Sequence, residues 1–344
     1  MSSARSNDVL GTAPAGDTSG AVLSVRDLVV EYATERGTVR AVDGVSFDLD
    51  PGEFIGIVGE SGCGKSTLLF AIAQLLSPPA GVASGSVIFK GVSMVGLTDR
   101  ELASVRWKDM SVVMQSAMNA LNPVKSIGAQ FTDAMRAHGV SAKAQIAERS
   151  AEVLRMVGID PIHLKSYPHQ LSGGMRQRSM IAMAMLLTPD LVIMDEPTSA
   201  LDVVAQRSLM AQIKELQEQL GFAVIFVTHD MSLVSHFSDR LMVMYAGLVA
   251  EFGGTRRVFD RPLHPYSIGL MEAFPSIRGP RVPLTGIPGS PPDLARPPQG
   301  CRFAPRCPKV MTRCPEEPPE LYQVDGTLVR CFLHADGDDG GRDD

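Results

Sequence analysis

Residues 59–67 read GESGCGKST, and this stretch decides how the whole chain is interpreted. It matches the pattern G-x-x-x-x-G-K-[ST], in which glycines let successive backbone N–H groups turn toward an anion. An apolar run typical of a buried strand, FIGIVG, precedes it at residues 54–59, and helix-forming residues follow. A chance glycine turn is the alternative, and the flanking strand and helix make it the weaker one. The stretch therefore predicts a nucleotide site, with Lys65 at the β- and γ-phosphates and Ser66 on Mg²⁺.

An acidic strand end forms the second motif, LVIMDEP at residues 191–197. In open α/β sheets, ligands bind at the carboxyl ends of the strands. We expect Asp195 to hold Mg²⁺, directly or through water, and Glu196 to polarise an attacking water. Because strand side chains alternate, Glu196 should point away from Asp195. A solvated strand end with two incidental acids is the alternative, and the phosphate loop argues against it.

A second set of small residues, LSGGMRQR at residues 171–178, opens another helix and exposes backbone N–H groups there. One nucleotide needs one such loop, so the second indicates either a second nucleotide or the same nucleotide held by another subunit. A simple Gly-Gly turn at a helix start is the other interpretation. His229, in VTHD, follows the last buried strand and could contact a γ-phosphate, although a lone histidine is more often structural.

The order of patterns along the chain predicts an α/β protein with a mainly parallel sheet. Strand patterns cover residues 21–32, 41–50, 54–59, 191–197 and 222–230, and helical spacing dominates residues 115–167. The character changes after Arg261, because 15 of the 24 prolines lie between Pro262 and Pro319. So many prolines resist long helices and predict an irregular, separately stabilised C-terminal module.

Composition sets the outer limits. The 344 residues suit two or three domains, and the net charge of −6 gives no reason to expect nucleic acid as a partner. Residues 1–20 are polar, lack the apolar core of a secretory signal, and are expected to be a disordered lead. No apolar run approaches the roughly 20 residues that span a bilayer. We therefore expect a soluble cytosolic protein that could dock onto a membrane protein.

The phosphate loop, LSGGMRQR, LVIMDEPTSALD and VTHD occur in the order found in one family. Over about residues 22–260 the chain resembles the ATP-binding subunits of ABC transporters. The resemblance implies a RecA-like P-loop nucleotide-binding domain over 21–260, with an antiparallel β subdomain and a helical subdomain at about 116–175. A small C-terminal oligopeptide-transporter module at 261–344 would follow it.

The resemblance also implies that ATP is sandwiched between two ATPase subunits, which accounts for the second anion site. The implied ATP contacts are Tyr32, Gly59, Ser61, Gly62, Cys63, Gly64, Lys65, Ser66 and Thr67 of one subunit and Ser172, Gly173 and Gly174 of the other. Gln115 matches the Q-loop, which contacts Mg²⁺ and the membrane subunits, and Ser199–Asp202 match the D-loop. Glu196, His229 and Gln115 are the implied catalytic residues, and Ser66, Gln115 and Asp195 the implied Mg²⁺ ligands.

Two of these residues have an alternative role, and one further residue departs from the usual sequence of the family. Tyr32 would stack on adenine, and its alternative is a tyrosine that only packs the sheet. Cys63 could be a catalytic thiol, but the loop works through its backbone and the position needs only a small residue. Met175 stands where many members have glutamine, although peptide importers often have methionine there.

The C-terminal region narrows the family. RPLHPYSIGLMEAFP at 261–275 and IPGSPPDLARPPQGCRFAPRCP at 287–308 resemble the extension of oligopeptide, dipeptide and nickel importer ATPases. The implied assembly has two transmembrane permease subunits, a second ATPase subunit and an extracytoplasmic peptide-binding protein. In this subfamily the second ATPase subunit is often a related but different chain, and an identical one is the alternative. The chain would lie at the cytoplasmic face of the inner or plasma membrane and power peptide import. A nickel or other solute importer is the alternative, whereas an export, DNA-repair or translation ATPase fits less well.

Four of the five cysteines, Cys301, Cys307, Cys314 and Cys331, lie in this module. Disulfides are unusual in the cytosol, and four thiolates suit either zinc or an iron–sulfur cluster. The spacings lack the short C-x2-C of many zinc sites, which favours the larger [4Fe–4S] cluster known in some members of the family. Zn²⁺ and free thiols are the alternatives. A metal would staple a module with little core, and four neighbouring arginines would offset its charge: Arg302, Arg306, Arg313 and Arg330.

Overall fold

The computed structural model describes five stretches of the chain: residues 20–35, 37–115, 120–198, 201–273 and 286–335. The predicted lead lies outside them apart from Gly20, as do residues 116–119 after Gln115 and residues 199–200 of the expected D-loop.

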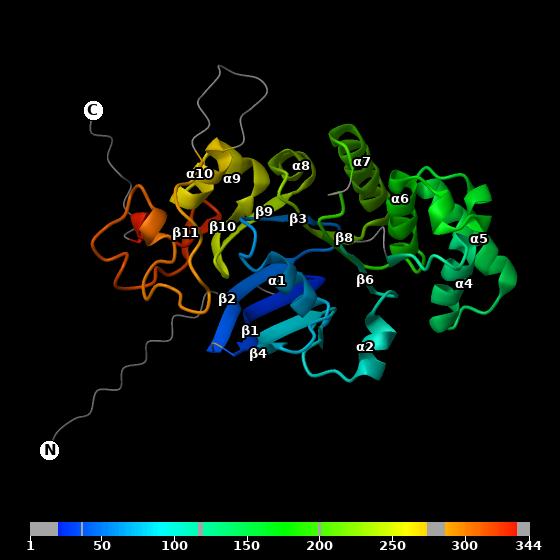
Figure 1. Cartoon of the computed structure of the whole chain (residues 1–344), viewed down its shortest axis with the longest axis horizontal. Coiled ribbons are helices and arrows are strands. Elements are labelled where there is room, and N and C mark those ends of the chain that lie inside the picture. The colour runs from blue at the N-terminus through cyan, green and yellow to red at the C-terminus, as the bar shows by residue number, and fades with distance from the viewer. Residues whose placement is uncertain (1–19, 36, 116–119, 199–200, 274–285, 336–344) are drawn as a thin grey trace.

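A central sheet carries the strands in the order β11-β12-β10-β9-β3-β8-β7-β6 (Figure 1). The strands from β9 to β6 run parallel, which confirms the predicted parallel sheet. Strands β3, β7 and β8 are buried along their whole length, because parallel strands carry apolar side chains on both faces. The parallel strands are β3 (Phe54–Val58), β6 (Met110–Val113), β7 (Leu191–Asp195), β8 (Ala223–Val227) and β9 (Arg240–Tyr245).

A second, antiparallel sheet has the order β2-β1-β4-β5 and confirms the expected β subdomain. Helix α1 lies beside it in Figure 1, and its apolar residues share one core with this sheet and with one face of the central sheet. The strands are β1 (Leu23–Thr34), β2 (Gly37–Leu49), β4 (Ala80–Phe89) and β5 (Val92–Ser93), and the helices α1 (Lys65–Ile72) and α2 (Asp99–Val105).

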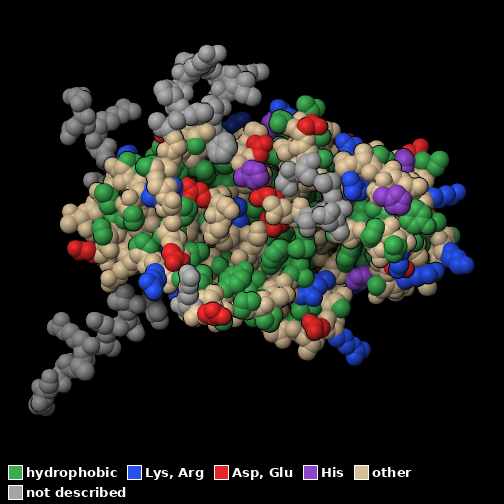
Figure 2. Space-filling model, viewed as in Figure 1, with side chains coloured by type: hydrophobic (Ala, Val, Ile, Leu, Met, Phe, Trp, Pro, Cys, Tyr) green, Lys and Arg blue, Asp and Glu red, His purple; other side chains and the backbone are tan. Residues whose placement is uncertain are grey.

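A group of helices forms one end of the molecule, where Lys and Arg side chains project from the visible face (Figures 1 and 2). Ser126 and Ser172 start two of these helices by accepting backbone N–H groups. Their apolar faces join the core on the other side of the central sheet. The helices here are α4 (Ile127–Ala137), α5 (Lys143–Met156), η1 (Pro161–Lys165), η2 (Pro168–Gln170) and α6 (Gly173–Ala184).

Further helices follow the central strands. They are α7 (Val203–Leu220), α8 (Met231–Phe237), α9 (Thr255–Asp260) and α10 (Pro265–Glu272). Among the residues that the structure describes, no helix is long and apolar enough to cross a membrane.

The C-terminal region continues the central sheet, because β12 pairs with β10 and β11 pairs with β12. This differs from the irregular, separately stabilised module expected from the sequence. The region still has a small core of its own, made of Ala304, Cys314 and Phe332. Its elements, together with the strand they extend, are β10 (Leu248–Gly254), η3 (Ala304–Arg306), β11 (Tyr322–Val324), β12 (Thr327–Val329) and η4 (Phe332–His334).

Candidate functional site

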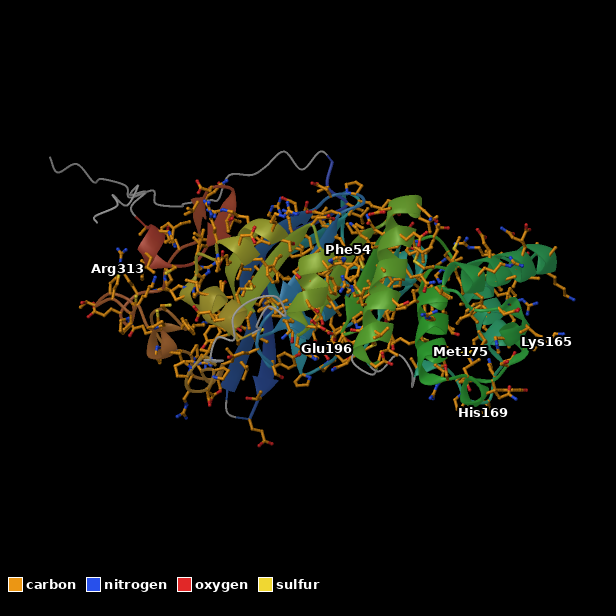
Figure 3. All side chains as sticks on the ribbon, turned by 90° about the horizontal axis from the view of Figure 1, so that it is seen from above. Phe54, Lys165, His169, Met175, Glu196 and Arg313 are labelled. Carbon is orange, nitrogen blue, oxygen red and sulfur yellow. The ribbon has the colours of Figure 1, made fainter. Side chains whose placement is uncertain are left out.

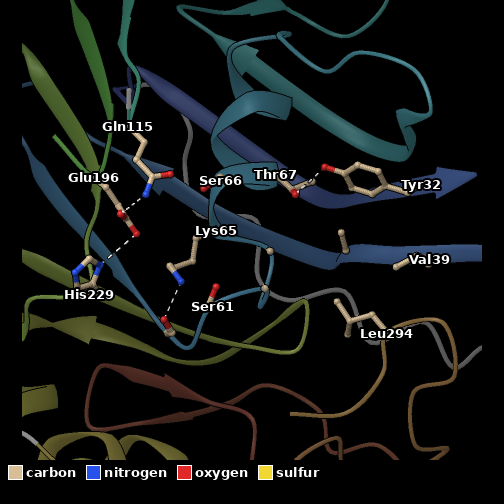
Figure 4. Close-up of a pocket in the computed structure, with 14 residues that line it drawn as sticks. Tyr32, Val39, Ser61, Lys65, Ser66, Thr67, Gln115, Glu196, His229 and Leu294 are labelled. Carbon is tan, nitrogen blue, oxygen red and sulfur yellow. Dashed lines mark hydrogen bonds and ion pairs between the residues drawn. The ribbon is translucent and has the colours of Figure 1, made fainter. Parts of the chain in front are cut away.

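A cavity of about 530 Å³ opens where the phosphate loop meets the two sheets (Figure 4). Its volume lies within the usual range for small-molecule and cofactor sites. The loop, both sheets and the C-terminal region all contribute to its wall. The lining residues are Tyr32, Val39, Ala41, Gly59, Ser61, Gly62, Gly64, Lys65, Ser66, Thr67, Gln115, Glu196, His229 and Leu294.

The phosphate loop joins β3 to α1 as predicted. Gly64 has φ +104°, and a Cβ built on it would lie 2.1 Å from the backbone oxygen of Ala41, so only glycine fits there. Lys65 is 8% exposed and donates to the carbonyl oxygens of Gly59 at 2.7 Å and Glu60 at 3.0 Å. The loop therefore offers a helix N-terminus and one ammonium group to an anion.

Ser66 and Asp195 meet beneath the loop. The Ser66 hydroxyl donates to Asp195 Oδ1 at 3.0 Å, and Asp195 is 3% exposed. Burial raises the pKa of Asp195, and the hydrogen bond from Ser66 opposes that rise. Asp195 thus lies behind Ser66, where it can orient the hydroxyl expected to bind Mg²⁺.

Glu196 stands at the open side of the cavity. Its backbone has φ +47° directly after β7, which turns the side chain into the cavity. Gln115 Nε2 donates to one carboxylate oxygen at 2.5 Å, and His229 Nδ1 lies 3.2 Å from the other (Figure 4). Strand alternation predicted only that Glu196 would diverge from Asp195. The left-handed turn explains why it joins Gln115 and His229.

Tyr32 and Cys63 occupy different surroundings. The Tyr32 hydroxyl lies 3.1 Å from Thr67 Oγ1, and the ring lines the cavity. Stacking of Tyr32 on adenine stays a prediction. The Cys63 side chain is 4% exposed and packs in the core of the β subdomain. Burial raises the pKa of the Cys63 thiol, which favours the neutral thiol and argues against a catalytic role.

The signature residues form a separate cavity of about 370 Å³, which shares no lining residue with the nucleotide cavity. Ser172 and Gly174 line it, and the Ser172 hydroxyl accepts the N–H of Met175 at 3.3 Å. Met175 lies toward the helical end, away from Glu196 (Figure 3). A single chain therefore does not bring the two predicted halves of the ATP site together.

The four module cysteines are partly or fully buried. Burial raises the pKa of Cys301 and Cys307, and raises that of Cys331 to about 11. The sulfurs of Cys307 and Cys314 accept backbone N–H groups at 3.4 Å, which is the kind of support that a thiolate needs. Within the described ranges, however, no group of three or more Cys, His, Asp or Glu residues is arranged to hold a metal ion.

The arginines beside these cysteines are engaged elsewhere, contrary to the expectation that they offset thiolate charge. Arg302 pairs with Asp43 and Arg306 with Glu60, both in the ATPase domain. The guanidinium of Arg313 lies over the Phe332 ring, and Arg330 donates to backbone carbonyls.

Sequence reasoning missed three lining residues of the nucleotide cavity. Val39 and Ala41 lie on β2, and Leu294 lies in the proline-rich segment. Strand β2 pairs with β1, the strand of Tyr32, and Val39 lies directly opposite Tyr32. The alternation of β2 could therefore have shown that Val39 and Ala41 share one face. No local pattern indicated that Leu294 would reach the loop.

A phosphate loop with its lysine, a serine–aspartate pair and a glutamate at the adjoining strand end define a P-loop ATPase. Comparison with known families identifies the class of ATPase more narrowly. The ABC transporter model matches residues 42–199, and the model of the oligopeptide/dipeptide transporter C-terminal region matches residues 250–314. An AAA domain model, of a putative AbiEii toxin, matches residues 164–235.

Curated relatives match nearly the whole chain. The dipeptide transport ATP-binding protein DppD of Bacillus subtilis is 45% identical, covering 91% of this chain and 94% of that protein. The oligopeptide transport ATP-binding protein OppD of Escherichia coli is 43% identical, covering 91% and 93%. A dimeric bacterial ABC transporter cassette matches with a TM-score of 0.62 and 28% identity over 68% of this chain and 99% of that one. The chain belongs to the family of oligopeptide and dipeptide ABC transporter ATP-binding subunits, and it is an ATPase.

Proposed function

We propose that the chain hydrolyses ATP to power the uptake of dipeptides or oligopeptides through a membrane ABC transporter. The observation that carries the proposal is the Glu196 carboxylate, held by Gln115 and His229 at the mouth of the phosphate-loop cavity. Relatives more than 40% identical over about nine-tenths of the chain are named for dipeptide and oligopeptide transport, which supports the substrate class.

Each residue then has a chemical task. Glu196 takes the proton of the attacking water, Gln115 holds the carboxylate toward the cavity, and His229 contacts the γ-phosphate. Lys65 binds the β- and γ-phosphates. Bound Mg²⁺ would neutralise phosphate charge. Ser66, Gln115 and Asp195 would hold it, Asp195 directly or through water while it supports the Ser66 hydroxyl.

The separate signature cavity supports a sandwich of two ATPase subunits. Ser172, Gly173 and Gly174 of a partner would close the cavity of this chain, because no signature residue of the same chain lines it. A related, different ATPase chain, two transmembrane permeases and an extracytoplasmic peptide-binding protein complete the proposed assembly. We place the chain at the cytoplasmic face of the inner or plasma membrane, with residues 21–260 as the ATPase domain and 261–344 as the C-terminal module.

The test is Glu196→Gln in the full-length chain assembled with its partners. We expect ATP binding to persist and hydrolysis to fall about 10²- to 10⁴-fold, the usual contribution of a general base. Glu218→Gln, at an exposed carboxylate on α7, is the matched control and should leave hydrolysis unchanged. Turnover near wild type in Glu196→Gln would refute the general-base role. Uptake of labelled dipeptide, compared with nickel, separates peptide import from its alternative.

We also propose that the four module cysteines bind a metal centre, with [4Fe–4S] as first choice and Zn²⁺ as the alternative. Four thiols in one small module support this, and each of Cys301, Cys307 and Cys314 contributes to the raised pKa of Cys331. Since the pKa values of Cys301, Cys307 and Cys331 are raised, metal binding has to displace protons, and the sulfurs must move closer together. Anaerobic purification with iron and zinc analysis and an absorbance spectrum tests it. A colourless, metal-free and fully folded protein would refute it.

A further inference from the structure

The second residue of the phosphate loop, Glu60, turns its side chain toward the C-terminal module. The loop residues that line the nucleotide cavity include Gly59, Ser61 and Gly62 on either side of it, but not Glu60. Both carboxylate oxygens of Glu60 accept hydrogen bonds from Arg306, at 2.8 and 2.9 Å. This is a bidentate ion pair between residues 246 positions apart.

Arg306 is fixed from several sides. It is 8% exposed, and its Nε donates to the carbonyl oxygen of Pro288 at 2.8 Å, while one of its terminal nitrogens donates to the Tyr245 hydroxyl at 3.2 Å. The hydrogen bonds with Glu60 raise the pKa of Arg306, so the guanidinium is permanently charged. A guanidinium with this many partners in a fixed fork has little freedom to leave the carboxylate.

The backbone of Glu60 is held as well. Its N–H donates to the hydroxyl of Tyr266 at 2.9 Å, and Tyr266 on α10 is fully buried. Its carbonyl accepts from Lys65, the residue expected to bind the phosphates. Glu60 therefore links the C-terminal residues to the ammonium group of the ATP site.

Other contacts join the same stretch of chain to the site. Arg302 pairs with Asp43 and donates to the carbonyl of Ala246, and the N–H of the following Gly247 donates to Cys63 of the loop. Leu294 lines the cavity on the side of Val39 (Figure 4). Residues 294–306 thus contact the nucleotide site at two places: Leu294 lines the cavity, and Arg306 holds Glu60 of the phosphate loop.

We propose that Arg306 is a positioning residue for ATP binding, which neutralises Glu60 and keeps its carboxylate turned away from the phosphates. A free carboxylate on the loop would repel a polyphosphate over a few ångströms, where opposite or like charges interact strongly. The module would then be part of the nucleotide site, in addition to any role in assembly. The inference rests on ATP binding at the loop and does not depend on which solute the transporter carries.

The experiment measures the affinity of the full-length chain for MgATP and MgADP by calorimetric titration. We expect Arg306→Met to raise Kd about tenfold, the size of one partly screened charge interaction. In the double variant Arg306→Met, Glu60→Gln, the orphaned charge is gone, so Kd should return to within about threefold of wild type. Hydrogen exchange of the amides at 60–64 should rise in Arg306→Met and fall again in the double variant.

A further ion pair between the module and the ATPase domain, one that lies at the surface, provides the control. Arg257 and Asp325 pair at 3.0 Å on the surface, so Asp325→Asn should leave Kd unchanged. An unchanged Kd in Arg306→Met would overturn the proposal. So would a double variant as weak as the single one, because Arg306 would then only stabilise the module. If Arg306→Met does not fold, Arg306→Gln, which removes the charge but keeps a side-chain N–H donor, should raise Kd in the same direction, and a wild-type Kd would refute the proposal.

Discussion

Lowering the pH should weaken the fold through one buried histidine, His264. It caps α10, where its Nδ1 accepts the N–H of Tyr266 at 2.9 Å, and it is 4% exposed. Burial lowers the pKa of His264 to about 3, from 6.5 in an unfolded chain. Because the unfolded chain takes up the proton first, stability is full above about pH 6.5 and declines as pH falls toward 3.

The size of the effect follows from these two pKa values. A pH of 5 is about 1.5 units below the pKa of His264 in the unfolded chain, so the imidazole is mostly protonated there. In the folded chain, where the pKa is about 3, the imidazole is neutral at pH 5. At about 1.4 kcal/mol per unit, the loss of unfolding free energy between pH 7 and pH 5 is about 2 kcal/mol. Glu251 accepts the N–H of His264, and burial raises the pKa of this glutamate, so it acts in the opposite direction.

The comparison that isolates His264 uses His264→Asn, since asparagine also caps helices but does not titrate. Urea unfolding, followed by circular dichroism at pH 7 and pH 5, gives the unfolding free energy of both proteins. Glu251 and the groups whose charges act on His264, Arg330 and His334, are present in both proteins, so their effects largely cancel in the difference. Wild type should lose about 2 kcal/mol more than the variant over this range. Equal losses in the two proteins would refute the assignment of a neutral, buried imidazole.

Two further predictions concern the phosphate loop. Cys63 is buried, and burial raises the pKa of its thiol, so maleimide should label Cys63 more slowly than Cys307, as followed by mass spectrometry. The Cys63→Ser variant should keep ATPase activity and should lose sensitivity to thiol reagents. Rapid labelling of Cys63, or an inactive serine variant, would contradict this. Gly64→Ala should abolish measurable ATP binding, because its Cβ would meet the backbone of Ala41 at 2.1 Å, whereas Gly91→Ala, also at positive φ but with no atom within 4 Å, should cost only about 1–2 kcal/mol and leave binding intact. Similar affinities in these two glycine variants would show that the close approach is not what requires Gly64.

Sequence patterns were sufficient to predict those parts of the fold whose geometry is set by a short run of consecutive residues. The phosphate loop and the apolar strands β3, β7 and β8 were predicted because each needs only a short run of residues in the right order. The β11–β12 hairpin was missed although it carried a signal. Asp325-Gly326 is a two-residue turn with both φ values positive, and such Asp-Gly turns connect paired strands. The proline-rich composition around this turn favours irregular structure, and for that reason the region was wrongly predicted to be irregular.

The ion pair of Glu60 with Arg306 had no such signal, because its partners are 246 residues apart and each looks like an ordinary surface charge in the sequence. The same holds for Leu294 at the cavity rim. Contacts of this kind depend on how the C-terminal region folds back along β10, and that pairing becomes visible only when the strands are placed in space.

The phosphate loop is supported by buried contacts within this chain, whereas the catalytic end of the nucleotide cavity is exposed. This difference indicates which steps of the ATPase cycle one chain can carry out alone. The phosphate loop is fastened from behind by buried Tyr266 and Arg306 of the same chain. At the other end, the His229 side chain beside Glu196 is 69% exposed. Ordered binding groups can act in a single chain, whereas an exposed catalytic end gains its final geometry only when another surface covers it. ATP affinity should therefore be largely a property of this chain, and hydrolysis a property of the closed pair.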